Sequence, residues 1–251
     1  MIEGMVSAIL PTFNRLELLK NSIGALIGQS YKNWELIIVD DNSTDRTEDF
    51  CNTLLLDTFK QLSLPNKVKY IKLNENSGST SIPRNIGISH SEGEFIAPID
   101  DDVYSTNLKF ELLVKCFEDK NITLAYGERV NTTIDENGEL VFGGVSQNDD
   151  WNPLETWGVD GGQYIYRSNV YTKYPLVFSR RACDWNTAKS IISDKSEVIH
   201  IDSVVCIYLW HATNRSVLMT DNKIDYPIFP KRFEQYFNIN SEFIIDLKEE
   251  V

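Results

Sequence analysis

The sequence predicts an α/β fold in which helices flank a mostly parallel central sheet, with a smaller mixed region in the second half. In the first 105 residues, four apolar segments of strand length alternate with segments whose apolar residues recur at helical spacing. Polar residues directly follow each of these four strand segments. Sheets of this kind bind ligands at the carboxyl ends of their strands, so a site is expected along this polar edge.

Turn-forming residues bound the strands of the first half. Asn14 is expected to cap the first helix, with Glu17 three residues later as a variant capping box. Pro83 falls in the first turn of the third helix, where proline is tolerated. The strands are expected at residues 5–10, 34–39 and 68–73 and from residue 93, and the helices at residues 16–27, up to about 61, and from about 81.

The second half has weaker periodicity. Apolar residues on one face predict a helix over residues 108–118. Asn137-Gly138 separates two strand-like segments, 124–134 and 140–145, which indicates a hairpin. Further elements are a glycine-bearing turn and strand at 159–167, a helix at 184–192, one or two strands at 198–210, and a tail from 221 that packs over the domain or forms a lid.

Composition narrows the class of protein. The net charge of −13 argues against a nucleic-acid-binding protein, which needs a basic face. The four cysteines are widely spaced without a CxxC motif, which favours reduced thiols and a cytoplasmic location. We see no signal peptide and no apolar run long enough for a transmembrane segment.

Three consecutive aspartates, Asp100–Asp102, follow the fourth strand. Adjacent carboxylates repel one another unless a cation or hydrogen-bond donors compensate them. Carboxylate oxygens suit Mg²⁺ or Mn²⁺, which are often held by one or two carboxylates together with substrate phosphates. The alternative is a solvated acidic loop. The gathering of other polar strand ends at the same edge favours the metal site.

Four segments of the first half resemble family 2 glycosyltransferases, which have the GT-A fold with a Rossmann-like sheet. They are Ala8–Arg15, Trp34–Asp45, Arg84–Gly87 followed by Glu92–Ile96, and Asp100–Asp102 at the position of the family's DxD metal motif. Two later segments are similar to family motifs more faintly. They are Cys183–Asn186, with Cys183 where the family commonly has Glu, and Tyr208–Ser216.

The resemblance implies a metal-dependent enzyme that transfers a sugar, with inversion, from a nucleoside diphosphate sugar to a hydroxyl group. UDP is the expected nucleotide, and the acceptor is a glycan, a lipid-linked sugar or a protein. Asp102 would bind Mn²⁺ or Mg²⁺, and Asp100 would face the ribose or a metal-bound water. His211 would be a further ligand, or else a structural histidine. The implied nucleotide-binding residues are Pro11, Thr12, Asn14, Asp41, Arg84, Asp100 and Asp101.

Several of these residues keep a structural alternative. Asp41 would accept the uracil imide N–H, whereas its neighbour Asp40 is expected to cap the next helix. Arg84 would meet the base or the diphosphate, or form a surface ion pair. For Asp101, a solvent-facing turn position is the favoured interpretation.

The remaining implied roles concern the reacting groups. Asp184 would be the general base that removes the acceptor proton, or else a helix N-cap. Asp160, Gly161 and Gly162 would shape the pocket for the donor sugar or acceptor, or form only a tight turn. Trp185 would stack on a sugar, or pack in the core.

Other classes of protein fit less well. A sugar-1-phosphate nucleotidyltransferase needs a glycine-rich loop after the first strand, and Leu10–Asn14 contains no glycine. A phosphatase of the HAD type carries its Asp-x-Asp after the first strand rather than the fourth. A non-catalytic module that binds nucleotide sugars or glycans remains the alternative. The chain is expected to divide into a nucleotide-sugar half (residues 1–105), an acceptor half of the same domain (106–220) and the tail (221–251).

Overall fold

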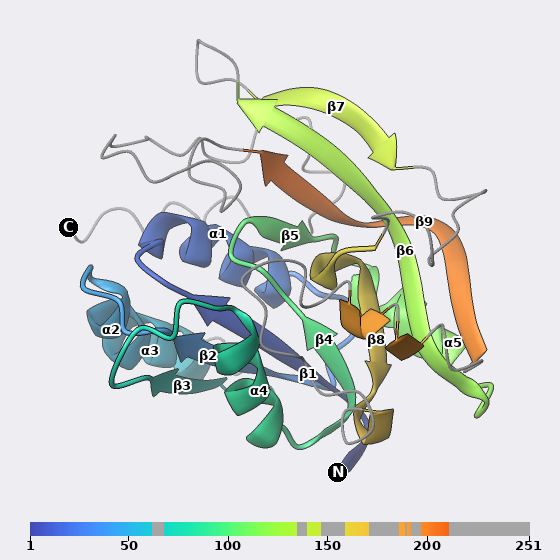
Figure 1. The fold of residues 1–251 in the computed structure, drawn as a ribbon, viewed down its shortest axis with the longest axis horizontal. Coiled ribbons are helices and arrows are strands. Elements are labelled where there is room, and N and C mark those ends of the chain that lie inside the picture. Colours follow the sequence, from blue (N-terminus) through green and yellow to red (C-terminus); the bar gives the residue numbers. More distant parts are fainter. Residues whose placement is uncertain are drawn as a thin grey trace.

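A single curled sheet forms the centre of the protein (Figure 1). The structure is a computed structural model, and it describes residues 1–61, 68–134, 140–146, 159–170, 186–188, 190–191 and 197–210. Within this part of the chain the sheet has nine strands, in the order β3-β2-β1-β4-β8-β6-β9-β5, with β7 paired to β6. The strands are β1 (Ile2–Thr12), β2 (Trp34–Asp40), β3 (Val68–Lys72), β4 (Gly93–Pro98), β5 (Val103–Ser105), β6 (Ile122–Ile134), β7 (Leu140–Ser146), β8 (Tyr164–Arg167) and β9 (Glu197–Trp210).

The first four strands are parallel to one another, as their alternation with helices predicts. Helices cover both faces of this part of the sheet (Figure 1). The helices are α1 (Leu16–Ile27), α2 (Thr47–Phe50), α3 (Leu56–Gln61), α4 (Ser81–Ser89) and α5 (Lys109–Cys116).

Alternate residues of each strand supply the two hydrophobic cores, because successive side chains point to opposite faces of a sheet. Ala8 and Leu10 of β1 belong to the core that also contains α1, α3 and α5 residues, among them Ile23 and Phe110. Ile9 of β1 belongs to the other core, with Ile88 of α4. The central strands are therefore apolar on both faces, which explains their unbroken runs of Ile, Leu and Val.

The start of α1 differs from the prediction. Asn14 does not cap this helix, because Arg15 occupies the N-cap position, and the Arg15 side chain makes no capping hydrogen bond. Asn14 has a positive φ of 52°, and its side-chain oxygen accepts a hydrogen bond of 2.7 Å from the backbone N–H of Thr44. The carboxylate of Asp45 instead accepts from the N–H of Leu16, at 3.2 Å. The cap is thus supplied from a distant loop that the sequence pattern could not indicate.

The helical segment predicted to end near residue 61 is present but irregular. Five residues of π-helix, Cys51–Leu55, separate α2 from α3. The third predicted helix, α4, begins at Ser81 and accommodates Pro83 in its first turn, as expected.

The second half adds strands to the same sheet. β6 and β7 form an antiparallel pair, and the turn residues Asn137-Gly138 lie outside the described residues. β6 also pairs with β8 and, in parallel, with β9. The predicted helix at 184–192 is described only at residues 186–188 and 190–191, which are helical. The tail from residue 221 lies outside the described residues.

β4 and β5 follow each other along the chain but are far apart in the order of strands. Three strands, β8, β6 and β9, separate them in the sheet. Since residues 99–102 alone connect β4 to β5, the sheet has to curl back on itself to bring these strands together. The sheet contains strands from both sides of residue 105, and the division of the chain at that residue stays a prediction.

No helix among the described residues has both the length and the apolar character needed to cross a bilayer.

Candidate functional site

Loops that follow β1, β2 and β3 meet at the carboxyl edge of the sheet, as predicted. The backbone N–H of Asp41 donates to the carbonyl of Thr12 at 2.9 Å. The side-chain amide of Asn76 donates to the carbonyl of Asp41 at 3.1 Å. Three segments that are distant in the sequence are thereby joined, two through their backbones and the third through the Asn76 side chain.

Asp41 lies at the centre of this edge and is 3% exposed. One of its carboxylate oxygens accepts from the backbone N–H of Ser77 at 2.9 Å, and the other accepts from the Ser77 hydroxyl at 3.0 Å. A carboxylate oxygen has a second lone pair, so this group retains capacity to accept from a ligand N–H.

Asp40, the neighbour of Asp41, has a structural role. Its carboxylate accepts from the backbone N–H of Ser43 at 2.7 Å and from the hydroxyl of Tyr70 at 2.6 Å. Burial and this carboxylate raise the pKa of the Tyr70 hydroxyl. Asp40 was expected to cap the next helix, but α2 begins only at Thr47, so the carboxylate closes the turn that precedes the helix.

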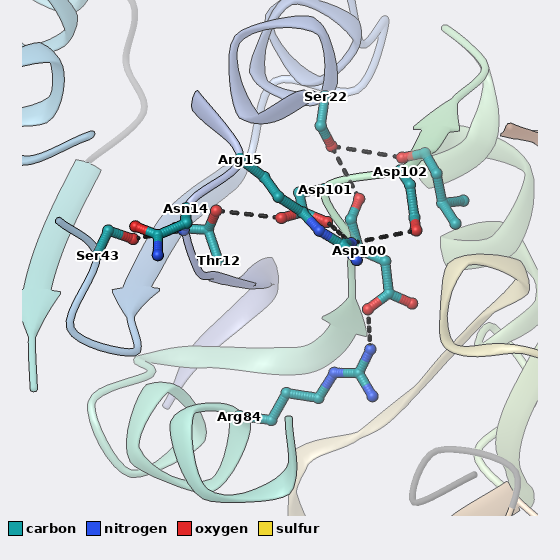
Figure 2. Close-up of polar contacts among 10 residues, drawn as sticks. Thr12, Asn14, Arg15, Ser22, Ser43, Arg84, Asp100, Asp101 and Asp102 are labelled. Carbon is teal, nitrogen blue, oxygen red and sulfur yellow. Dashed lines mark hydrogen bonds and ion pairs between the residues drawn. The ribbon is translucent and has the colours of Figure 1, made fainter. Parts of the chain in front are cut away.

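The acidic loop Asp100–Asp102 follows β4 and contacts both the β1–α1 loop and α4 (Figure 2). The expectation that Asp101 faces solvent is wrong. This side chain is buried, and its two oxygens accept from Thr12 Oγ1 at 3.1 Å and from Arg15 Nη1 at 3.0 Å. Burial raises the pKa of the Asp101 carboxyl, and the nearby Arg15 guanidinium opposes that rise. The loop turns its middle residue inward because a cation and a hydroxyl are there to compensate it.

Asp100 pairs with Arg84, which reaches it from α4 (Figure 2). Arg84 is only 2% exposed, so the alternative of a surface ion pair is wrong. The ion pair itself exists and is largely buried on the arginine side. Asp100 is partly exposed, with 23% of its side chain accessible. Arg84 thus fixes the first carboxylate of the loop from beneath.

The backbone around Asp102 is fixed by β9 and α1. Its carbonyl accepts from the N–H of Leu209 in β9 at 3.1 Å. The hydroxyl of Ser22 in α1 donates to the carbonyls of Asp100 and Val103, at 3.1 and 3.3 Å (Figure 2). Burial, with Asp102 and Asp100 nearby, raises the pKa of the Tyr208 hydroxyl. Hydrogen bonds from β9 and from α1 therefore fix the backbone that carries the Asp102 side chain.

A short turn at Gly161–Gln163 packs against the strand that follows the acidic loop. A Cβ atom on Gly162 would lie 2.3 Å from Val103 Cγ1 of β5, so only glycine permits this approach. The buried ammonium of Lys109 donates to the Gly162 carbonyl at 2.7 Å. Asp160, which precedes the turn, forms an ion pair with Arg129 of β6. Gly162 thus allows close packing against β5, and a sugar-binding role for this turn stays a prediction.

The other predicted residues cannot be placed in the same way. Asp184, Trp185 and His211 lie outside the described residues. Conversely, the sequence did not single out Arg15, Ser77 or Lys109. Arg15 follows a strand end beside Asn14, which is a signal that could have identified it. A buried lysine such as Lys109 has no such signal, since lysine is ordinarily exposed.

Comparisons with known proteins agree on one family. The family model described as glycosyl transferase family 2 matches residues 7–168. The glucosyltransferase WfgD of Escherichia coli, named as a UDP-Glc:alpha-D-GlcNAc-diphosphoundecaprenol beta-1,3-glucosyltransferase, is 31% identical over 138 residues, which cover 55% of this chain and 49% of that protein. The poly(ribitol-phosphate) beta-N-acetylglucosaminyltransferase TarP of Staphylococcus aureus is 35% identical over 126 residues, or 49% of this chain and 36% of TarP. The chain therefore spans half or less of the length of these curated relatives.

Solved structures with the same fold are more distant in sequence. TarS 1-349 of S. aureus in complex with UDP-GlcNAc has a TM-score of 0.66 and 20% identity, over 86% of this chain and 61% of that one. The mannosyltransferase PcManGT of Pyrobaculum calidifontis, in complex with GDP-Man and Mn²⁺, has a TM-score of 0.62 and 19% identity, over 80% of this chain and 56% of that one.

Proposed function

The chain belongs to glycosyltransferase family 2 and has the GT-A fold, and from this we propose that it transfers a sugar from a UDP-sugar to an acceptor hydroxyl with inversion. The observation that carries the proposal is the polar edge of the sheet. There Thr12 links Asp41 to the acidic loop Asp100–Asp102. Its carbonyl accepts from the Asp41 N–H, and its hydroxyl donates to the Asp101 carboxylate. TarS, which shares the fold, is named as a complex with UDP-GlcNAc, which supports UDP as the nucleotide.

Recognition of the nucleotide is assigned to the loops after β1 and β2 and to α4. Asp41 would accept the imide N–H of uracil with the lone pairs that Ser77 leaves available. Pro11 and Thr12 would line the base pocket, with Asn14 beside them. Arg84 would act mainly by holding Asp100 toward the ribose, since its guanidinium is buried against that carboxylate.

A divalent ion, Mn²⁺ or Mg²⁺, is assigned to Asp102 with help from Asp100. The described residues contain no group of three or more His, Cys, Asp or Glu side chains suited to a metal. One or two carboxylates suffice when substrate phosphates complete the coordination, and the oxygen donors here are of the kind these ions prefer. The Mn²⁺ named with PcManGT, which shares the fold, supports the assignment. When bound, the ion would neutralise charge that builds on the diphosphate leaving group.

The acceptor side is assigned to Asp184, Trp185 and His211, which lie outside the described part of the chain, and to the described turn at Asp160–Gly162. Asp184 would accept the proton of the acceptor hydroxyl while that oxygen attacks the anomeric carbon and the bond to the diphosphate breaks. His211 would contact the metal or the diphosphate, and Trp185 would stack on a sugar. Asp160, Gly161 and Gly162 would form one wall of the same pocket. Glycan, lipid-linked sugar and protein acceptors all fit this chemistry.

A thermal-shift screen of nucleotide sugars with Mn²⁺ or Mg²⁺ tests the donor side. Binding to the native state alone raises the unfolding midpoint by mass action. We expect UDP and UDP-sugars with metal to raise it, and Asp102→Ala to abolish the metal-dependent part. Asp49→Ala, which removes an exposed carboxylate of α2, is the matched control and should behave as wild type. No shift with any nucleoside diphosphate and either metal would contradict the proposal.

Release of UDP in the presence of an acceptor separates an enzyme from a binding module. Asp184→Asn should abolish turnover and retain UDP-sugar binding, because it removes the proton acceptor and keeps the size of the side chain. Asp202→Asn, on an exposed position of β9, is the control. If no acceptor class stimulates UDP release while donor binding persists, the non-catalytic alternative is the better description.

A further inference from the structure

Arg15 lies between two carboxylates of the acidic loop (Figure 2). Its Nη1 atom is 3.0 Å from Asp101 Oδ1 and 3.4 Å from Asp102 Oδ2. The arginine side chain is 21% exposed, and those of Asp101 and Asp102 are 8% and 11% exposed. A single guanidinium nitrogen thus contacts both a buried structural carboxylate and the carboxylate to which the divalent ion is assigned.

The two contacts of Arg15 are not equivalent. Asp101 is buried, with Thr12 as its other hydrogen-bond donor, and removing a cation from a buried carboxylate is costly. The contact with Asp102 is longer, and the backbone of Asp102 is held independently by Leu209. Loss of the longer contact would therefore leave the loop in place, with Arg15 still on Asp101.

We propose that Arg15 takes the place of the divalent cation at Asp102 in the metal-free protein, and that it couples binding of the metal to binding of the nucleotide diphosphate. The inference rests on the function proposed above. A guanidinium and a divalent ion within a few ångströms of the same carboxylate repel each other. The diphosphate supplies the negative charge that offsets both cations. The metal should therefore bind weakly alone and tightly with UDP, and by linkage UDP should gain the same factor from the metal.

Titration of Mn²⁺, with the free ion followed by electron paramagnetic resonance, tests this without any turnover. In wild type, UDP should lower the dissociation constant for Mn²⁺. In Arg15→Gln, the Mn²⁺ dissociation constant without UDP should fall by about fivefold or more, the lower end of typical coupling factors. The ratio of the constants without and with UDP should fall accordingly.

Lys20→Gln is the matched control. It removes one positive charge from α1, the helix that Arg15 directly precedes, and the Lys20 ammonium pairs with Glu17 rather than with the acidic loop. Its Mn²⁺ affinity should remain within twofold of wild type, about the range expected of a distant, screened charge. A gain as large as that of Arg15→Gln would assign the effect to net charge and overturn the proposal.

Arg15→Lys is the second variant. Lysine keeps the charge on a compact, strongly hydrated head that fits this bridging position less well. Its Mn²⁺ affinity without UDP should lie between those of wild type and Arg15→Gln, and it carries the test if Arg15→Gln does not fold.

Mn²⁺ affinity in the Arg15 variants that is equal to or weaker than in wild type would overturn the inference and leave the proposed function standing. Failure of wild type to bind Mn²⁺ in the presence of UDP would instead overturn the proposed function, and the inference with it.

Discussion

The buried Lys109 side chain should make the free energy of unfolding depend on pH. Its ammonium is fully buried, and burial lowers its pKa from 10.5 to about 8. The unfolded chain then binds this proton at pH values where the folded chain has lost it. The free energy of unfolding should therefore rise with pH between about 8 and 10.5.

Lys109→Met should lack this dependence. Between about pH 7 and about pH 9, wild type should gain about 1 kcal/mol of stability relative to the variant. Urea unfolding of both proteins at the two pH values measures the difference, and cysteines and tyrosines that titrate in both proteins cancel. Lys120→Met, at an exposed position, is the control. If the difference in unfolding free energy between the two proteins stays constant with pH, folding does not lower the pKa of Lys109.

At the scale of single residues, the sequence predicted which side chains gather but not how each is used. Asp41, Thr12 and Asp100–Asp102 were identified because each follows a strand end. The inward orientation of Asp101 was missed, because it depends on Arg15, a residue 86 positions away that compensates the buried carboxylate. Partners of this kind are set by how loops meet in space, and no local pattern encodes them.

At the scale of elements, Gly87 determines how closely α4 approaches the sheet. A Cβ atom there would lie 2.5 Å from Ile9 Cγ2 of β1 and 3.2 Å from Val39 Cγ2 of β2. Gly87→Ala should therefore push α4 outward and lower the free energy of unfolding by about 1–3 kcal/mol, the usual cost of overpacking. Chemical denaturation measures the loss.

Gly24→Ala in α1 is a matched control with the opposite expected sign. No atom lies within 4 Å of a Cβ built at Gly24. Alanine favours a helix over glycine by up to about 1 kcal/mol, so this variant should be stabilised. Equal effects of the two substitutions would contradict the assigned packing of α4.

The elements of the first half were predicted well because strand and helix alternate with clear periodicity. β1, β2, β3, β4, α1 and α4 lie where they were expected, with shifts of a few residues at their ends. The π-helical residues Cys51–Leu55 were not predicted, since their pattern is that of an ordinary helix. The order of the later strands was not predictable either, because β8 enters between β4 and β6 and nothing local specifies that neighbour.

At the scale of the whole molecule, the carboxyl ends of the parallel strands carry the candidate site, whereas polar contacts at their amino ends stabilise the fold. At the amino ends, opposite the candidate site, the fully buried Glu35 accepts from the Ser7 hydroxyl at 2.7 Å and from the backbone N–H of Glu92 at 2.6 Å. Lys69 lies 3.3 Å from its second oxygen. This carboxylate joins three strands and the turn before β4.

Glu35→Gln should lower stability without changing ligand binding. The amide nitrogen would face Lys69 with a donor in place of an acceptor, at a cost of about 2 kcal/mol. The increase in unfolding midpoint caused by UDP with Mn²⁺ should remain that of wild type. Glu17→Gln, with 54% of the Glu17 side chain exposed, should change stability by less than about 0.5 kcal/mol. A folded Glu35→Gln protein that no longer responds to UDP would contradict this separation of tasks.

Because the sheet curls, ligand binding at the acidic loop should stabilise strands at a distance from the site. Residues 99–102 connect β4 and β5, which three other strands separate in the sheet. A ligand that binds these residues therefore stabilises the contact between the first strands of the sheet and the last. Local unfolding of β8 or β9, which lie between β4 and β5, would then also require loss of the ligand contacts at residues 99–102. The amide protons of β8 and β9 should therefore exchange with deuterium more slowly in the liganded protein.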